Sequence, residues 1–168
     1  MNEHQLTVVE STWGGRPELV DTTGIIDYGS LMQLALERAK TAREAIKVMT
    51  GLVKKYGYYS SGESFTIADP NEAWILDLIG KGPGRRGAVW VAVRIPDDCI
   101  AGHATYPRIH KSPMDDKENC LYSPDVISFA REMGYLDGLN KDFSFARAYS
   151  PADFGALRAC DARVWSFF

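Results

Sequence analysis

Hydrophobic and polar positions change their spacing along the chain. Between residues 28 and 57, apolar side chains recur every three or four positions, which is the spacing of one face of a helix. Between residues 65 and 95, alternation and short apolar runs take over, and both are typical of β-strands. Helical spacing returns after residue 123. The pattern predicts an α+β fold with helices before and after a strand-rich middle.

Local signals place the ends of the helices. Thr41 and Glu44 have the spacing of a capping box, in which Thr41 accepts from a free backbone N–H and Glu44 accepts from the N–H of Thr41. A helix should start there, and Gly57 can end it. Further along, Ser123–Asp125 offers an N-cap serine followed by a proline at the first helical position. The segment Gly155–Phe168 is a further expected helix.

Four segments have the residue pattern of strands, and they are His4–Thr12, Ala73–Ile79, Ala88–Ile95 and Ile100–Thr105. Apolar and polar residues also alternate over Phe65–Asp69, before the turn residues that precede Ala73. The connections in this middle part are too short for parallel crossovers, so we expect an antiparallel meander.

Composition limits the class of protein. The chain has 168 residues, 45% of them hydrophobic and 24% charged, which suits a single domain over residues 1–168. A net charge of -3 without a basic block argues against nucleic-acid binding. No apolar run reaches the length of a membrane span, so we expect no membrane partner. The three cysteines form no CxxC pattern and indicate neither zinc nor disulfides, and no cofactor is predicted.

The segment Gly80–Gly87 is rich in glycine and carries Arg85 and Arg86. A phosphate-binding loop needs the GxxxxGK[ST] spacing and a helix N-terminus behind it. This segment lacks the spacing, and strands are expected on both sides of it. We therefore interpret it as a loop between strands whose arginines are solvated.

Histidines in the middle of the chain suggest two kinds of chemistry. His103 and His110 are seven residues apart, with Asp115 and Asp116 beyond them. Metal ligands converge more tightly, which favours a hydrogen-bonded structural role for His103 and no metal site. Cys99 and His103 suggest a thiol–imidazole pair. Four residues along a strand would separate them by roughly 13 Å, so a direct pair needs a bend.

Seven segments carry a family resemblance when they are taken in chain order. They are MNEHQLTVVEST-GGR, DYGSL, ALERAKTAREAIKVM, GYYSSGESFTIADPNEAWILDLIGKGPG, WVAVRIPDD, NCLYSPDVISFARE and ARVWSFF. Together they resemble the dipeptidase A family of cysteine N-terminal-nucleophile hydrolases, to which the secernins are related. The segments cover nearly all of the chain and are specific as a set. The resemblance implies hydrolysis of the peptide bond of dipeptides.

The resemblance also implies a fold and a nucleophile. The fold would be part of a four-layer αββα sandwich with two antiparallel sheets. The nucleophile would be a cysteine at the mature N-terminus, whose own α-amino group is the base. Cys99, Cys120 and Cys160 are internal and do not stand where that cysteine belongs. We therefore expect Met1 to be an interior methionine or a start assigned too late, and the chain to be an inactive internal portion of a larger domain.

Three residues are candidates for supporting catalytic roles. Asn2 matches a segment where related amide hydrolases place an oxyanion-hole asparagine, and a strand-edge asparagine is the alternative. Thr105 stands where relatives usually read the Asn of His-Ala-Asn, so it would be a weaker hydroxyl donor. Arg163 matches an arginine that orients the substrate or the cysteine, and a surface salt bridge is the alternative.

Other functions stay open at this point. The missing nucleophile and Thr105 suggest a non-catalytic binding or assembly module that keeps the fold. An independent thiol hydrolase would use Cys99 or Cys120 with a histidine. Exposed sheet edges and an uncovered apolar face predict a homodimer or a larger assembly. Free cysteines favour the cytoplasm, but a signal peptide would be missing together with the N-terminus.

Overall fold

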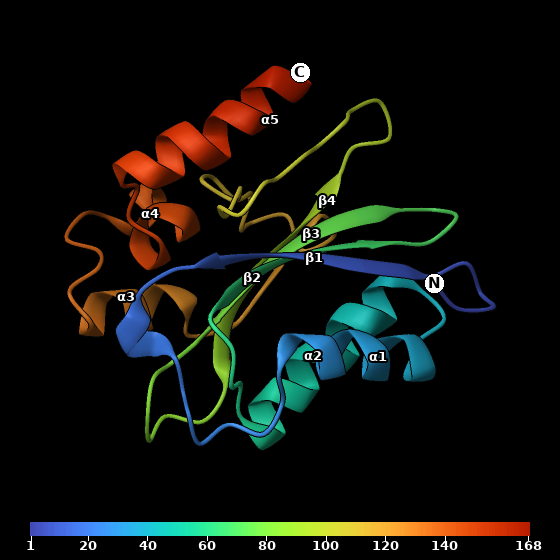
Figure 1. Cartoon of the computed structure of the whole chain (residues 1–168), viewed down its shortest axis with the longest axis horizontal. Helices are drawn as coiled ribbons and strands as arrows, with labels where there is room; N and C mark the ends of the chain where they lie inside the picture. Colours follow the sequence, from blue (N-terminus) through green and yellow to red (C-terminus); the bar gives the residue numbers. More distant parts are fainter.

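The computed structural model describes all residues from 1 to 168 and contains one sheet with helices on both faces (Figure 1). The strands are β1 (Thr7–Gly14), β2 (Gly62–Ala68), β3 (Ala73–Gly80), β4 (Ala88–Ile95) and β5 (Cys120–Tyr122). The helices are α1 (Tyr28–Arg38), α2 (Ala42–Tyr56), α3 (Val126–Glu132), α4 (Phe145–Tyr149) and α5 (Ala162–Phe167). A π-helical turn, Ala156–Asp161, leads into α5, and short 3-10 turns lie at Pro17–Leu19 and Asn140–Asp142.

The five strands follow one another in chain order across the sheet, and every neighbouring pair is antiparallel. The predicted meander and the α+β class are therefore confirmed. In the register, Ser11 lies opposite Ser64, and Ser64 lies opposite Asp77. Paired residues of an antiparallel sheet point to the same side, so these three polar side chains share one face.

The predicted strand Ile100–Thr105 is wrong, because this segment crosses a face of the sheet without pairing at its edge. Thr105 has a φ of 50°, which lies outside the range of a strand. Its N–H donates to Oγ of Ser11 at 2.9 Å. His103 Nε2 lies 2.8 Å from Oγ1 of Thr66. Bonds to side chains on the sheet face take the place of strand pairing, and β5 pairs with β4 instead.

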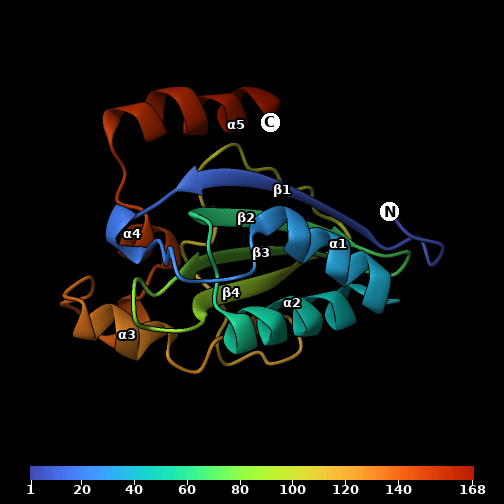
Figure 2. The same ribbon diagram turned by 60° about the horizontal axis from the view of Figure 1, so that its bottom comes forward.

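Different parts of the chain bury the two faces of the sheet. Helices α1 and α2 cover one face (Figure 2) and share a core of 20 buried residues with β1–β4. The connection from β4 to β5, together with α3 and α4, contributes to a second core of 15 buried residues on the other face. The structure holds one sheet, so the four-layer sandwich stays a prediction.

The capping box at the start of α2 is confirmed in part. Oγ1 of Thr41 accepts from the N–H of Glu44 at 3.3 Å, and α2 begins at the next residue after Thr41. The carboxylate of Glu44, however, accepts from the N–H of Lys40 and not from that of Thr41. Gly57 follows the helix with a φ of 78°, as its predicted role at the helix end requires.

Ser123 does not cap α3, contrary to prediction. The helix begins at Val126, and Oγ of Ser123 accepts from the N–H of Trp90 on β4 at 3.3 Å. Ser123 is buried, so its hydroxyl satisfies a strand N–H and ties the start of α3 to the sheet.

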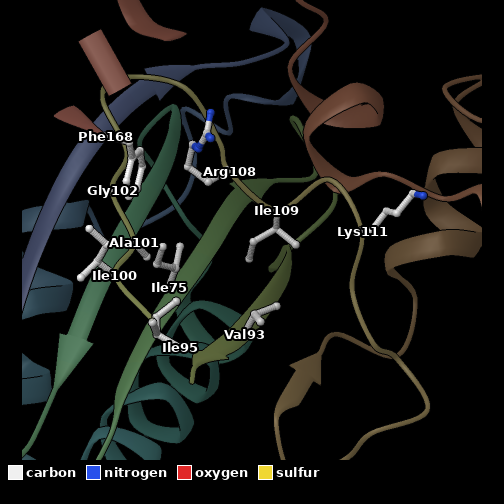
Figure 3. A pocket seen from close by; sticks show the side chains of 10 residues that line it. All are labelled: Ile75, Val93, Ile95, Ile100, Ala101, Gly102, Arg108, Ile109, Lys111 and Phe168. Atoms are coloured by element: carbon white, nitrogen blue, oxygen red, sulfur yellow. The ribbon is translucent and has the colours of Figure 1, made fainter. Parts of the chain in front are cut away.

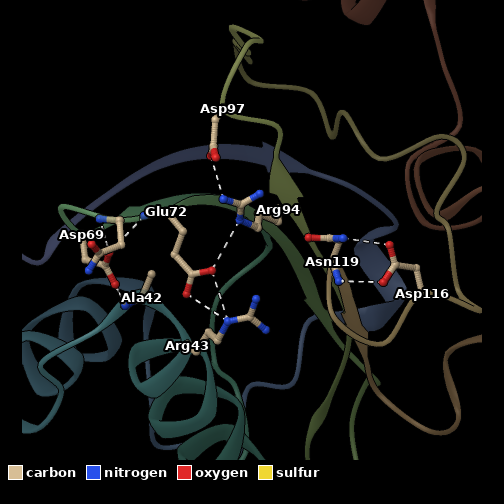
Figure 4. Close-up of polar contacts among 9 residues, drawn as sticks. Ala42, Arg43, Asp69, Glu72, Arg94, Asp97, Asp116 and Asn119 are labelled. Carbon is tan, nitrogen blue, oxygen red and sulfur yellow. Dashed lines mark hydrogen bonds and ion pairs between the residues drawn. The ribbon is translucent and has the colours of Figure 1, made fainter.

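The turn between β2 and β3 joins the sheet to α2 (Figure 4). Asp69 accepts from three backbone N–H groups, those of Ala42, Asn71 and Glu72, at 2.8, 2.8 and 3.1 Å. Burial raises the pKa of Asp69, but these donors outweigh it, and the pKa ends below its usual value. Glu72 pairs with Arg43 of α2 at 3.0 Å and so adds a second link.

We expect Asp69→Ala to lower the free energy of unfolding by about 1–2 kcal/mol, because it removes an N-terminal cap of α2 and a turn acceptor. The lowered pKa means that this stability is present above the unfolded pKa and is lost as the pH falls through the folded value. Urea denaturation at pH 7 and pH 3 measures both effects. Asp97→Ala, which removes an exposed partner of Arg94, is the control and should cost far less.

The predicted helix at Gly155–Phe168 is confirmed as the π-helical turn and α5. It lies outside the strands, on the side of the sheet away from α1 and α2 (Figure 2). The ring of Phe167 lies against Gly102, and Val164 is the buried residue of α5. Trp165 is 82% exposed. None of the helices combines the length and apolarity needed to cross a membrane.

Candidate active site

A buried acid fixes the irregular segment above the sheet. Asp77 of β3 is fully buried and accepts from Oγ of Ser64 at 2.5 Å. Its second oxygen accepts from the N–H groups of Arg108 and Ile109, both at 3.0 Å. Burial raises the pKa of Asp77 to about 6, and the bonds from Ser64 and the backbone oppose that rise. The carboxylate of Asp77 therefore fixes the irregular segment, at Arg108 and Ile109, to the face of the sheet.

Thr105 is held in an unfavourable backbone conformation within this segment. The hydroxyl of buried Tyr106 donates to the carbonyl of Ser150 at 2.9 Å, and Ser11 holds the N–H of Thr105. Between these anchors Thr105 keeps its φ of 50°. Such a conformation of a β-branched residue costs on the order of 1–3 kcal/mol and is found preferentially at functional sites.

Thr105, Arg163 and Cys160 meet at one point. Nη2 of Arg163 donates to Oγ1 of Thr105 at 2.6 Å, and Sγ of Cys160 lies 3.0 Å from the same oxygen. Arg163 also donates to the carbonyls of Ala159 and Ala104 and forms no ion pair. Because a guanidinium can only donate, the hydroxyl hydrogen of Thr105 is free for the sulfur or for a ligand oxygen. The structure thus brings two of the three predicted site residues together.

A cavity of about 370 Å³ opens beside this cluster and is lined by Thr105 and Cys160. Gly15, with a φ of 81°, also lines the cavity. Asp153 lines it too, and its carboxylate accepts from the N–H of Ala156 at 2.7 Å. A hydroxyl donor and a carboxylate on one cavity suit a small ligand that carries both a carbonyl oxygen and a cationic group.

A second cavity, of about 280 Å³, is also bounded by the irregular segment (Figure 3). Apolar side chains of β3, β4 and residues 100–109 form most of its walls. Arg108 and Lys111 add positive charge, and Nη1 of Arg108 pairs with Asp161 at 2.9 Å. Such a cavity suits an apolar group next to a carboxylate.

Asn2 is not part of the Thr105 cluster and lies at the C-terminal end of α1. Its amide nitrogen donates to the carbonyls of Leu36 and Ala39, at 2.8 Å each. Its oxygen accepts from the N–H groups of His4 and Leu6. The amide is therefore fully hydrogen-bonded, and an oxyanion role requires one of the bonds to α1 to open.

The other two thiols are poorly placed for nucleophilic chemistry. Cys99 is exposed, and desolvation and the Asp98 carboxylate raise its pKa. Burial raises the pKa of Cys120 to about 11. Neither thiol is hydrogen-bonded to a histidine, so an independent thiol hydrolase at Cys99 or Cys120 is disfavoured.

His103 has the structural hydrogen bond that the sequence suggested, with Thr66 as its partner. Burial lowers its pKa, so the ring is neutral at pH 7. Asp116 accepts from the N–H groups of Glu118 and Asn119 within its own turn, and Figure 4 shows its contact with Asn119. No group of three or more His, Cys, Asp or Glu side chains converges on a common point.

Two residues that position the site were not predicted. Asp77 has one signal, an acid inside the apolar run Ala73–Ile79, since a buried carboxylate requires partners. Ser11 has no comparable signal. Cys160 and Arg163 are three residues apart in a helical segment and therefore share a face, which does signal a joint role.

Comparison with known proteins decides the class of this chain. The family model described as Peptidase family C69 matches residues 1–168. The chain belongs to peptidase family C69. The resemblance to the dipeptidase-type peptidases is confirmed, and membership of this family supports a peptidase function.

Three curated proteins that are similar to this chain are named as probable dipeptidases. A probable dipeptidase of Salmonella dublin is 29% identical over 168 residues, or 96% of the chain. A probable dipeptidase of Latilactobacillus sakei is 33% identical over 136 residues, or 81% of the chain. A probable dipeptidase B of Streptococcus pyogenes serotype M1 is 27% identical over 122 residues, or 73% of the chain. The matches span only 36%, 27% and 23% of these relatives.

Proposed function

We propose that this chain forms part of a dipeptidase that hydrolyses peptide bonds with an N-terminal cysteine as nucleophile. The observation that carries the proposal is the hydrogen bond of Arg163 to Thr105 beside a cavity, in a chain of peptidase family C69. The names of the three relatives support dipeptides as substrates. Cavities of about 370 and 280 Å³ have room for small ligands.

In the proposed reaction the cysteine thiolate attacks the carbonyl carbon, and negative charge develops on the carbonyl oxygen. The hydroxyl of Thr105 donates to that oxygen, while Arg163 holds Thr105 and adds positive charge. The α-amino group of the cysteine takes the thiol proton and passes it to the leaving amine. Water then hydrolyses the acyl-enzyme.

The proposed nucleophile lies outside these 168 residues. Cys99, Cys120 and Cys160 are internal and carry no α-amino base, so we propose that the chain alone does not turn over peptides. In the same proposal, residues 1–168 are an internal portion of one αββα domain. Asn2 acts there as a second oxyanion donor after one of its bonds to α1 opens.

The test uses the full-length gene product and a dipeptide library. We expect Thr105→Val to lower kcat about 100-fold with little change in KM, because the donor acts on the transition state. Arg163→Met should act in the same direction through Thr105. Thr105→Asn, which supplies the amide donor that the family resemblance implies at this position, should keep activity.

Arg158→Met is the matched control, because Arg158 is an exposed arginine of the same helical segment that lies over the ring of Phe154. It should leave kcat unchanged. A folded full-length product without peptidase or amidase activity would falsify the proposal. Turnover by residues 1–168 alone would overturn the placement of the nucleophile.

The alternative function is a binding or assembly module that keeps this fold. It is favoured by the internal positions of the three cysteines and by Thr105, which stands where the family resemblance implies an Asn. Saturable dipeptide binding without turnover by the full-length product supports this alternative. Turnover of the bound dipeptides excludes it.

We also propose that the chain forms a homodimer or a larger assembly. β1 is an eight-residue strand at one edge of the sheet, so one row of its backbone groups has no strand partner. Light scattering of residues 1–168 should show a mass that rises with concentration. A monomeric mass at high concentration contradicts the proposal.

A further inference from the structure

A groove on the helix-covered side of the molecule gathers positive charge. It lies between α2, the loop that joins β3 to β4, and the start of α3, and its volume is about 630 Å³. Four cationic side chains line it, two from α2 and two from the loop: Lys47, Lys54, Lys81 and Arg86. Ala88 and Trp90 of β4 add an apolar wall.

The charges of this groove are largely uncompensated. Asp125 is the one carboxylate among the lining residues, and it pairs with Lys81. Lys47, Lys54 and Arg86 form no ion pair with any carboxylate of the chain. Like charges around one concave space repel one another, and a polyvalent anion between them removes that repulsion.

The backbone leaves the groove open for a ligand. Gly87 has a φ of 109° and lies where a Cβ would approach Cα of Lys54 and Nζ of Lys81, both at 3.9 Å. Gly51 on α2 also lines the groove, and a Cβ there would meet nothing within 4 Å. Glycines at both positions keep side-chain bulk out of the space between the cations.

We propose that this groove binds a soluble anion that carries two or more phosphate groups. The glycine-rich segment Gly80–Gly87 is the loop between strands that the sequence predicted, and it lacks the helix behind it that a phosphate loop needs. Its cations instead face the lysines of α2 across the groove. Ammonium and guanidinium groups are the side chains that proteins use for phosphate.

The shape and the overall charge favour a small anion over a polymer or a surface. The cavity volume lies within the usual range for small-molecule sites. The whole chain has a net charge of -3, so it lacks the wide basic field that binds nucleic acid or an anionic membrane. The groove shares no lining residue with the cavity beside the Thr105 cluster, so the proposal does not depend on the peptidase function.

Isothermal titration with inorganic triphosphate at low salt tests the groove. We expect saturable binding with one triphosphate per chain, which weakens as salt is raised. The double variant Lys54→Gln with Arg86→Gln should weaken binding at least about tenfold, since it removes cations from both walls. Both side chains are exposed, so folding should persist, and circular dichroism checks this.

Lys55→Gln is the matched control, because Lys55 is an exposed lysine next to Lys54 that does not line the groove. It should change the affinity less than twofold. An equal loss in this control, or no saturable binding at all, overturns the proposal. Citrate bound as tightly as triphosphate overturns the preference for phosphate.

A parallel titration with ATP identifies the source of the phosphate groups. ATP that binds more tightly than triphosphate and changes tryptophan fluorescence supports a nucleotide stacked near Trp90. Equal affinity without a fluorescence change supports an inorganic polyphosphate.

Discussion

Replacing Asp77 by alanine should lower the free energy of unfolding by about 3–5 kcal/mol. The carboxylate is fully buried and is the acceptor for Ser64 and for the N–H groups of Arg108 and Ile109. Alanine leaves these donors without that acceptor, and each unsatisfied buried donor costs about 1–3 kcal/mol. Urea denaturation measures the loss. Hydrogen exchange should show faster exchange around Thr105, because its segment loses the anchor.

A matched variant at the surface separates the effect of burial on stability from the effect of the number of hydrogen bonds. Asp116 also accepts from two backbone N–H groups, those of Glu118 and Asn119, but it lies in a surface turn. Asp116→Ala should cost much less, because water can satisfy the freed groups. Asp77→Asn keeps the shape and one acceptor oxygen and should fall between the two alanine variants. Equal losses at both sites would contradict a special role for the buried carboxylate.

The protein should lose stability as the pH rises from about 5 to 8, and Glu63 should cause most of the loss above pH 6.5. Glu63 is fully buried on the helix-covered face, and Oγ1 of Thr12 donates to it at 2.8 Å. Burial raises its pKa from 4.5 to about 8, and the bond and charge of Glu10 act in the same direction. The hydroxyl of Tyr58, buried nearby, offers no bond to either acid.

The raised pKa of Glu63 determines the direction in which stability changes with pH. The folded protein binds a proton at Glu63 that the unfolded chain releases above pH 4.5. Stability from this group is therefore complete below pH 4.5 and declines up to about pH 8, by about 1.4 kcal/mol for each pH unit. Asp77, whose pKa is raised to about 6, adds to the loss below that pH.

Glu63→Gln isolates this effect. The amide keeps an acceptor for Thr12 and offers a donor to Glu10, so it imitates the protonated acid. We expect the variant to be more stable than the parent at pH 8 and nearly independent of pH from 6.5 to 8 in urea denaturation. Glu37→Gln, on the exposed side of α1, should show the same decline of unfolding free energy with pH as the parent. A flat profile in the parent would rule out a protonated Glu63.

The two predictions concern opposite faces of the same sheet. Asp77 keeps its charge at neutral pH because four polar groups surround it, counting the nearby Arg108 guanidinium. Glu63 has Thr12 as its donor and an acid as its neighbour, so it takes up a proton instead. Hydrogen-bond donors, more than depth of burial, decide which acid stays ionised.

Local structure was determined by the sequence alone. The helix α2 was predicted from the Thr41 cap to Gly57, and its periodic residues Ile46, Met49 and Val53 are buried. The central strands and their antiparallel order were predicted as well. These features depend on side chains within a few positions of one another, because caps and periodic faces are local. The family resemblance could likewise be found from the sequence, since it rests on short segments that occur in chain order.

The site was decided by the tertiary structure. Thr105 and Arg163 are 58 residues apart, and Asp77 and Arg108 are 31 apart, so no local pattern indicates either contact. The segment predicted as a strand at Ile100–Thr105 does not pair as one, because Ser11 and Thr66 on the sheet face bind it instead of a strand partner. Long-range contacts of this kind depend on how the sheet and the helices pack against one another. The sequence by itself therefore determined the elements and the family, while packing decided which polar groups meet.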